Sequence, residues 1–158
     1  MSFTHQSAPK NLAPVLLDGT NLTMQQLTSI ARHRTKVQLS AEAIAKVHLA
    51  RGAVESRLGS GETFYGINTG FGALAAVRIP DPQLKQLQVN LIRSHACGVG
   101  EPLSIEVVRA VMVLRLQTML RGNSGVREDT LRQMEFFLNE NIHPVIPSQG
   151  SVGACGDL

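Results

Sequence analysis

The chain has 158 residues, of which 43% are hydrophobic and 17% are charged, with a formal net charge of +3 at pH 7. This length suits one domain, and the apolar content is enough to build a core. The fifteen Lys and Arg residues are spread along the chain without a basic block, which argues against a nucleic-acid partner. No apolar run approaches the roughly 20 residues that span a bilayer, so we expect no membrane association.

The first residues of the chain and its cysteines indicate the cellular compartment in which we expect the protein. Residues 1–11 are polar and lack the basic-then-apolar order of a signal peptide. The two cysteines, Cys97 and Cys155, lie far apart and match neither a disulfide framework nor metal-ligand spacing. We therefore expect a cytoplasmic protein without a bound metal, in which Cys97 is a small buried residue of a helix.

Apolar residues at helical spacing predict two helices in the first third of the chain. The first runs from Thr23 to about His33, and the second from Ala41 to Leu58. Ser40 can cap the second helix, and Gly59 can end it.

Residues 59–80 lack helical periodicity and contain five glycines. Side chains such as Phe64 and Leu74 make this stretch too apolar for a solvated linker. Long irregular segments in compact domains are usually functional or disordered, so we expect a functional loop.

Three further helices are predicted in the rest of the chain. Asp81-Pro82 suits a helix start, and His95 ends the apolar face of that helix. Ser104 suits the cap of a fourth helix, which is apolar nearly all round from Val107 to Leu120 and is therefore expected to be central and buried. A fifth helix covers about residues 127–141. The pattern predicts an all-α fold, mainly helical with long irregular functional loops.

The segment Ala154-Cys155-Gly156 can form an electrophile from its own backbone. In a tight bend, the amide nitrogen of Gly156 can attack the carbonyl carbon of Ala154, because glycine has no side chain to obstruct the approach and Gly153 permits the bend. Loss of water and of the heteroatom on the Cys155 β-carbon would leave a methylidene conjugated to an imidazolone.

Three segments resemble the histidine and aromatic amino acid ammonia-lyases. Residues 150–158, Gly-Ser-Val-Gly-Ala-Cys-Gly-Asp-Leu, resemble the segment that forms the family's electrophile. Residues 65–72 resemble its catalytic tyrosine loop, and residues 87–95 resemble a third family segment in the expected order. The resemblance, which extends from about residue 17 to 158, departs at Cys155, where the family carries serine. A cysteine could lose hydrogen sulfide where a serine loses water.

The resemblance implies that residues 1–158 are the N-terminal region of a larger helical-bundle ammonia-lyase, with the tyrosine loop at 59–80 and the cofactor-forming segment at 150–158. The remainder of the protein would follow Leu158, and this piece alone would be inactive. The implied assembly is a homotetramer with shared active sites. The implied cofactor is 4-methylidene-imidazol-5-one (MIO), formed from Ala154, Cys155 and Gly156 and supported by Gly153 and Asp157, with Tyr65 as the catalytic base that removes the substrate β-proton.

The pair Ser94-His95 bears on the amino-acid substrate, because the branches of the family differ there. A Ser-His pair resembles the histidine-specific branch, in which His95 can hydrogen-bond the substrate imidazole, with Ser94, Asn68 and Gly72 as further substrate-binding residues. That branch eliminates ammonia from L-histidine to give urocanate, the first step of histidine degradation. Some tyrosine aminomutases also resemble Ser-His at this pair. The alternatives are a tyrosine or phenylalanine ammonia-lyase or aminomutase on the same cofactor, or an inactive fragment that acts only in assembly.

Each of these residues also has a simpler interpretation. His95 could be a capping residue, Tyr65 could pack against helices, and Asp157 could make a turn-stabilising hydrogen bond as readily as assist ring closure. The glycine spacing in residues 66–72 fits neither a phosphate loop nor a dinucleotide fingerprint. Three matching segments in the right order favour the functional interpretation.

Overall fold

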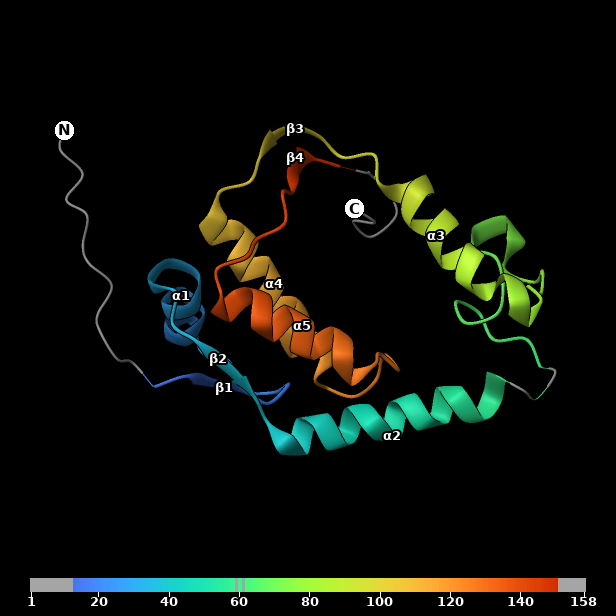
Figure 1. The fold of residues 1–158 in the computed structure, drawn as a ribbon, viewed down its shortest axis with the longest axis horizontal. Coiled ribbons are helices and arrows are strands. Elements are labelled where there is room, and N and C mark those ends of the chain that lie inside the picture. The colour runs from blue at the N-terminus through green and yellow to red at the C-terminus, as the bar shows by residue number, and fades with distance from the viewer. Residues whose placement is uncertain (1–12, 59, 61, 151–158) are drawn as a thin grey trace. The chain divides into compact units, whose positions relative to one another are not determined.

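The computed structural model describes residues 13–58, 60 and 62–150. These residues fall into two compact units: the core unit, within residues 1–51 and 104–144, and the loop unit, within residues 52–103 and 145–158. In chain order, the elements in Figure 1 are β1 (Val15–Leu17), α1 (Met24–His33), β2 (Val37–Leu39), α2 (Ala41–Leu58), η1 (Gly72–Leu74), η2 (Asp81–Gln83), α3 (Leu84–His95), β3 (Val99–Pro102), α4 (Ile105–Met119), α5 (Glu128–Asn139) and β4 (Pro147–Gln149). The prediction of a mainly helical fold is confirmed.

Helix α1 begins with a capping box at Thr23. The Thr23 hydroxyl accepts a hydrogen bond from the Gln26 backbone N–H at 3.2 Å, and the Gln26 side-chain oxygen accepts one from the Thr23 backbone N–H at 2.9 Å. Two backbone donors at the helix start are thereby satisfied. The helix ends at His33 and is followed by the C-cap residue Arg34, whose φ of 57° lies in the left-handed region. These bounds agree with the predicted helix from Thr23 to His33.

Helix α4 contributes much of the apolar core of the core unit. Ser104 caps it as predicted, with its hydroxyl accepting the Val107 backbone N–H at 3.4 Å. One side, which includes the fully buried Leu116, packs against α1 and α5, the latter lying beside it in Figure 1. On the other side Val111 and Leu114 are 46% and 47% exposed. The helix is therefore central in this unit, as predicted, but its burial is incomplete, because α1 and α5 cover one side and leave Val111 and Leu114 partly exposed.

Arg109 of α4 is a fully buried cation. Its Nε donates to the carbonyl of Ile30 at 2.9 Å and its Nη1 donates to the carbonyl of Leu138 at 2.9 Å. Nη1 also lies 3.3 Å from Asn141 Oδ1 and 3.1 Å from His143 Nε2. Because the carbonyls at helix C-termini lack intrahelical partners and carry partial negative charge, they are suitable acceptors for this cation. Burial lowers the pKa of the Arg109 guanidinium.

Strands β1 and β2 form a short parallel pair, with Val15 opposite Val37. The outer edge of β2 is covered by side chains of α5. Asn139 Oδ1 accepts the Val37 N–H at 2.8 Å, and Asn139 Nδ2 donates to the Val37 carbonyl at 3.0 Å. Glu135 accepts the Leu39 N–H at 3.0 Å. Residues four apart on α5 therefore supply the hydrogen bonds that a third strand would make.

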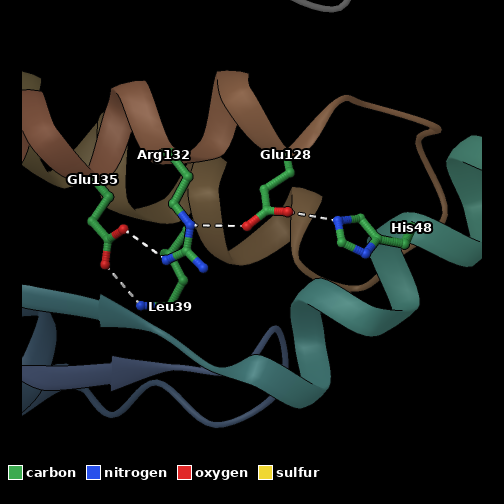
Figure 2. Close-up of polar contacts among 5 residues, drawn as sticks. All are labelled: Leu39, His48, Glu128, Arg132 and Glu135. Atoms are coloured by element: carbon green, nitrogen blue, oxygen red, sulfur yellow. Dashed lines mark hydrogen bonds and ion pairs between the residues drawn. The ribbon is translucent and has the colours of Figure 1, made fainter.

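Glu135 also belongs to a chain of ion pairs and hydrogen bonds that joins α5 to α2 (Figure 2). Arg132 donates to Glu128 and to Glu135 at 3.0 Å each, and Glu128 lies 2.6 Å from Nε2 of His48. The hydrogen bonds from His48 and Arg132 lower the pKa of Glu128. Because the side chains of His48 and Arg132 are 58% and 46% exposed, this network contributes little to stability.

In the loop unit, the helix predicted after Pro80 begins later than expected. Asp81 and Pro82 form the start of η2, and α3 begins only at Leu84. The prediction that Cys97 is buried in this helix is wrong, because α3 ends at His95 and Cys97 is exposed. Strands β3 and β4 pair antiparallel, with Val99 opposite Gln149. The described part of residues 59–80 has no α-helix and contains η1 and an isolated bridge between Thr69 and Arg78, as expected for an irregular loop.

Candidate active site

Tyr65 lies at the start of a turn in the irregular loop, with 65% of its surface exposed. Its ring meets the ring of Phe71 edge to face, with centroids 6.0 Å apart and an interplanar angle of 69°. This arrangement is one that aromatic pairs prefer. The Tyr65 ring therefore has an aromatic contact with Phe71, and most of its surface is exposed in this chain.

Asn68, predicted to bind substrate, is fully buried in the same loop. Its Oδ1 accepts the Phe64 backbone N–H at 2.7 Å, and its Nδ2 donates to the Glu62 carbonyl at 2.8 Å. The Asn68 backbone carbonyl accepts the Ile79 N–H at 2.8 Å. In this conformation the carboxamide joins parts of the loop backbone.

Thr69 is the other fully buried polar residue of the loop. Its hydroxyl accepts the Gly66 N–H at 3.2 Å and donates to the Gly70 carbonyl at 2.8 Å. A Cβ at Gly70 would lie 2.5 Å from the Cβ of Leu74, so the chain passes itself there too closely for a side chain. Thr69 was not among the predicted site residues, although it stands inside the tyrosine-loop motif.

Gly72, the fourth predicted substrate-binding residue, begins η1 with a φ of 56°. This left-handed conformation favours glycine over residues with a side chain. A Cβ at this position would meet no atom within 4 Å. The glycine therefore serves the turn and leaves open space beside it.

Ser94 and His95 occupy the last turn of α3. The Ser94 hydroxyl donates to the Leu91 carbonyl at 2.9 Å and lies 2.8 Å from Nδ1 of His95. Nδ1 of His95 is also 2.9 Å from the Leu91 carbonyl. Because a carbonyl only accepts, Nδ1 carries the proton in that contact, and in the neutral ring Nε2 is then an acceptor. The imidazole is thus oriented by its own helix end.

The predicted site residues of the described chain belong to the loop unit, with Tyr65, Asn68 and Gly72 on one loop and Ser94 and His95 on α3. The predicted cofactor residues Gly153, Ala154, Cys155, Gly156 and Asp157 lie outside the described residues. Within the part of the chain that the structure describes, no three His, Cys, Asp or Glu side chains could hold a metal ion together. None of its helices is both long and apolar enough to cross a membrane.

Comparison with known sequences gives a family match over residues 22–158, to the family described as aromatic amino acid lyase. A histidine ammonia-lyase of Staphylococcus aureus is 50% identical over 142 residues, which are 90% of this chain and 28% of that protein. The chain thus spans about 28% of the length of this curated relative.

Two solved structures extend the likeness to the fold. Histidine ammonia-lyase from Trypanosoma cruzi matches with a TM-score of 0.80 and 39% identity, over 89% of this chain and 27% of that one. Tyrosine aminomutase from Streptomyces globisporus matches with a TM-score of 0.84 and 36% identity, over 88% of this chain and 26% of that one. With the match over residues 22–158, these likenesses show that the chain belongs to the aromatic amino acid lyase family.

Proposed function

We propose that this chain is the N-terminal region of an ammonia-lyase that converts L-histidine to urocanate and ammonia, the first step of histidine degradation. The observation that carries the proposal is the 50% identity to a histidine ammonia-lyase over 90% of this chain. Because the chain spans 28% of that relative, the proposal concerns a complete enzyme in which further residues follow Leu158.

In this proposal Tyr65 removes the β-proton of the substrate. A general base must come within hydrogen-bond reach of the proton that it takes. The exposed position of Tyr65 on the loop and its edge-to-face contact with Phe71 support this role, since the phenol can reach a bound molecule while its ring stays anchored.

His95 selects the substrate in this proposal. Nδ1 of the imidazole faces the Leu91 carbonyl, and in this proposal the ring hydrogen-bonds the substrate imidazole. Ser94, which contacts Nδ1 of His95, helps to orient the ring. Asn68 and Gly72 were also expected to bind substrate, and Gly72 leaves open space for it.

We further propose that Ala154, Cys155 and Gly156 form the MIO cofactor, with Gly153 and Asp157 assisting ring closure. The residue types fit, because glycine at position 156 has no side chain to obstruct attack by its amide nitrogen and Cys155 carries a β-heteroatom that can leave. When formed, this group supplies an electrophile for the substrate amine. With cysteine at position 155, the β-carbon loses its sulfur as hydrogen sulfide, whereas a serine would lose water.

We propose a homotetramer with shared active sites as the assembly. Tyr65, Leu74 and Val77, all in the tyrosine loop, are 65%, 59% and 49% exposed. Apolar surface gathered on one segment is usually covered in the working protein. A neighbouring subunit of a symmetric oligomer would cover it and complete the site. Fully active monomers of the complete enzyme would contradict this assembly.

The function is tested by assaying the complete enzyme with histidine, tyrosine and phenylalanine. We expect release of ammonia from histidine, loss of most turnover in Tyr65→Phe with an unchanged circular dichroism spectrum, and loss of the ring's ultraviolet absorbance in Cys155→Ala but not in Cys155→Ser. Near-normal turnover in Tyr65→Phe would remove this residue from the mechanism.

An aminomutase is the second candidate, favoured by the TM-score of 0.84 to tyrosine aminomutase. The products of the same assay separate the two, because a mutase keeps the amino group on the product and a lyase releases ammonia. A β-amino acid formed from tyrosine, with no urocanate from histidine, would select the mutase.

A further inference from the structure

We propose that Asn68 and Thr69 are positioning residues for Tyr65, which hold the loop backbone on both sides of the tyrosine. In this inference Asn68 acts through the loop and makes no direct contact with the substrate. The inference rests on the proposed role of Tyr65 as the base.

Asn68 holds the residue before the tyrosine. Its Oδ1 accepts the N–H of Phe64 at 2.7 Å, and its own backbone N–H donates to the Phe64 carbonyl at 3.2 Å. Its Nδ2 donates to the Glu62 carbonyl at 2.8 Å. Because the side chain is 0% exposed and its oxygen and nitrogen both bond to the backbone, it faces the loop interior.

Thr69 holds the residue after the tyrosine. Its hydroxyl accepts the N–H of Gly66 at 3.2 Å and donates to the Gly70 carbonyl at 2.8 Å. Gly66 has a φ of 75°, so the backbone turns sharply directly after Tyr65. The N–H groups of both neighbours of Tyr65 are therefore bonded to adjacent buried side chains.

These hydrogen bonds matter because, among the described residues, the Tyr65 side chain has little packing around it. Tyr65 is 65% exposed, and the ring contact that the structure describes for it is with Phe71. The buried residues among those described in the loop unit are Asn68, Thr69 and Gly70, so polar contacts replace apolar packing there. A displacement of about 1 Å at a reacting group can cost roughly 100-fold in rate.

A matched set of threonine variants tests the role of Thr69 in the complete enzyme. Thr69→Val keeps the shape of the side chain and removes the hydroxyl, whereas Thr69→Ser keeps the hydroxyl. We expect Thr69→Val to lower kcat by roughly 10- to 100-fold with little change in KM, and Thr69→Ser to stay near wild type. Thr63→Val, at an exposed position of the same loop, is the control and should leave kcat unchanged.

Asn68→Asp separates positioning from substrate contact. The aspartate keeps the size and the acceptor of the side chain but loses the donor to the Glu62 carbonyl. We expect a fall in kcat with KM largely retained. A rise in KM at unchanged kcat would overturn the positioning role of Asn68.

Tyrosine fluorescence gives a readout that is independent of activity. Tyr65 is the only tyrosine in residues 1–158, which contain no tryptophan, so the part of the complete enzyme's emission that disappears in Tyr65→Phe reports on this side chain. We expect lower fluorescence anisotropy in Thr69→Val, and wild-type anisotropy in Thr69→Ser and Thr63→Val. Unchanged anisotropy and kcat in Thr69→Val would overturn the proposal. Normal turnover in Tyr65→Phe would instead show that Tyr65 is not the base. The anisotropy of Thr69→Val would still show whether Thr69 holds the loop.

Discussion

Every buried hydrophobic residue that the structure describes lies in the core unit, whereas the buried residues described in the loop unit are Asn68, Thr69 and Gly70. Burial of apolar surface is the main favourable term in folding, so the core unit holds most of the stability of this chain. The site residues stand in the other unit, where hydrogen bonds set the conformation. Functional loops commonly come from the less stable part of a protein, carried by a more stable scaffold.

The largest expected effect is the loss of stability when a buried leucine of the core unit is truncated, compared with a half-buried leucine of the loop unit. Leu116 of α4 is 0% exposed, and Leu116→Ala should lower the free energy of unfolding by about 3–5 kcal/mol. Leu87 of α3 is only half-buried, and Leu87→Ala should cost about 1 kcal/mol. Urea unfolding of the two variants, followed by circular dichroism, makes the comparison. Equal losses of unfolding free energy in the two variants would contradict the conclusion that the core unit holds most of the stability.

A smaller loss is expected from removing the buried cation of the core unit. Arg109→Met keeps an apolar stem and leaves the carbonyls of Ile30 and Leu138 without their donors. Each unsatisfied group costs about 1–3 kcal/mol, and relief of the burial cost of the charge offsets part of this. We expect a net loss of roughly 2 kcal/mol in urea unfolding. Arg115→Met, at an exposed position of the same helix, is the control. A loss no greater than that of the control would show that these bonds contribute nothing.

The smallest expected effect is a pH dependence from His143. Burial, then the positive charges of Arg109 and Arg34, lower the pKa of His143 from its ordinary value of 6.5. Below about pH 6.5 the unfolded chain therefore binds protons more readily than the folded chain, so stability falls as the solution is acidified. His143→Gln keeps an acceptor for Arg109 and does not titrate. Its unfolding midpoint should fall less than that of wild type between about pH 7.5 and pH 5.5. If the unfolding midpoints of wild type and His143→Gln fell equally over this pH range, His143 would not be the source of the pH dependence.

The sequence predicts elements whose signals are local. Helix α2 has its predicted bounds because a continuous helical pattern follows Ser40, whose hydroxyl accepts the Ala43 N–H at the helix start. Strands β1 and β2 have three residues each, which is too short for an alternating pattern to stand out. Their pairing depends on residues about twenty positions apart, which local patterns do not reveal.

The features that the sequence does not predict depend on contacts between residues far apart in the chain. An arginine in an apolar helix suggests a surface position, and the burial of Arg109 follows only from the meeting of Ile30 and Leu138 around it. In the site, the family motifs indicate Tyr65 and His95 from sequence alone. The bonds that Thr69 makes depend on a backbone turn at Gly66, which residue types alone do not specify.

The covered edge of β2 bears on how this chain avoids self-association. An open strand edge is a template to which a strand of another molecule can add. At β2 the N–H and carbonyl of Val37 and the N–H of Leu39 are already bonded to Asn139 and Glu135. An incoming strand would have to displace α5 side chains before it could pair there. While α5 is folded this edge resists aggregation, and local unfolding of α5 would be the event that opens it.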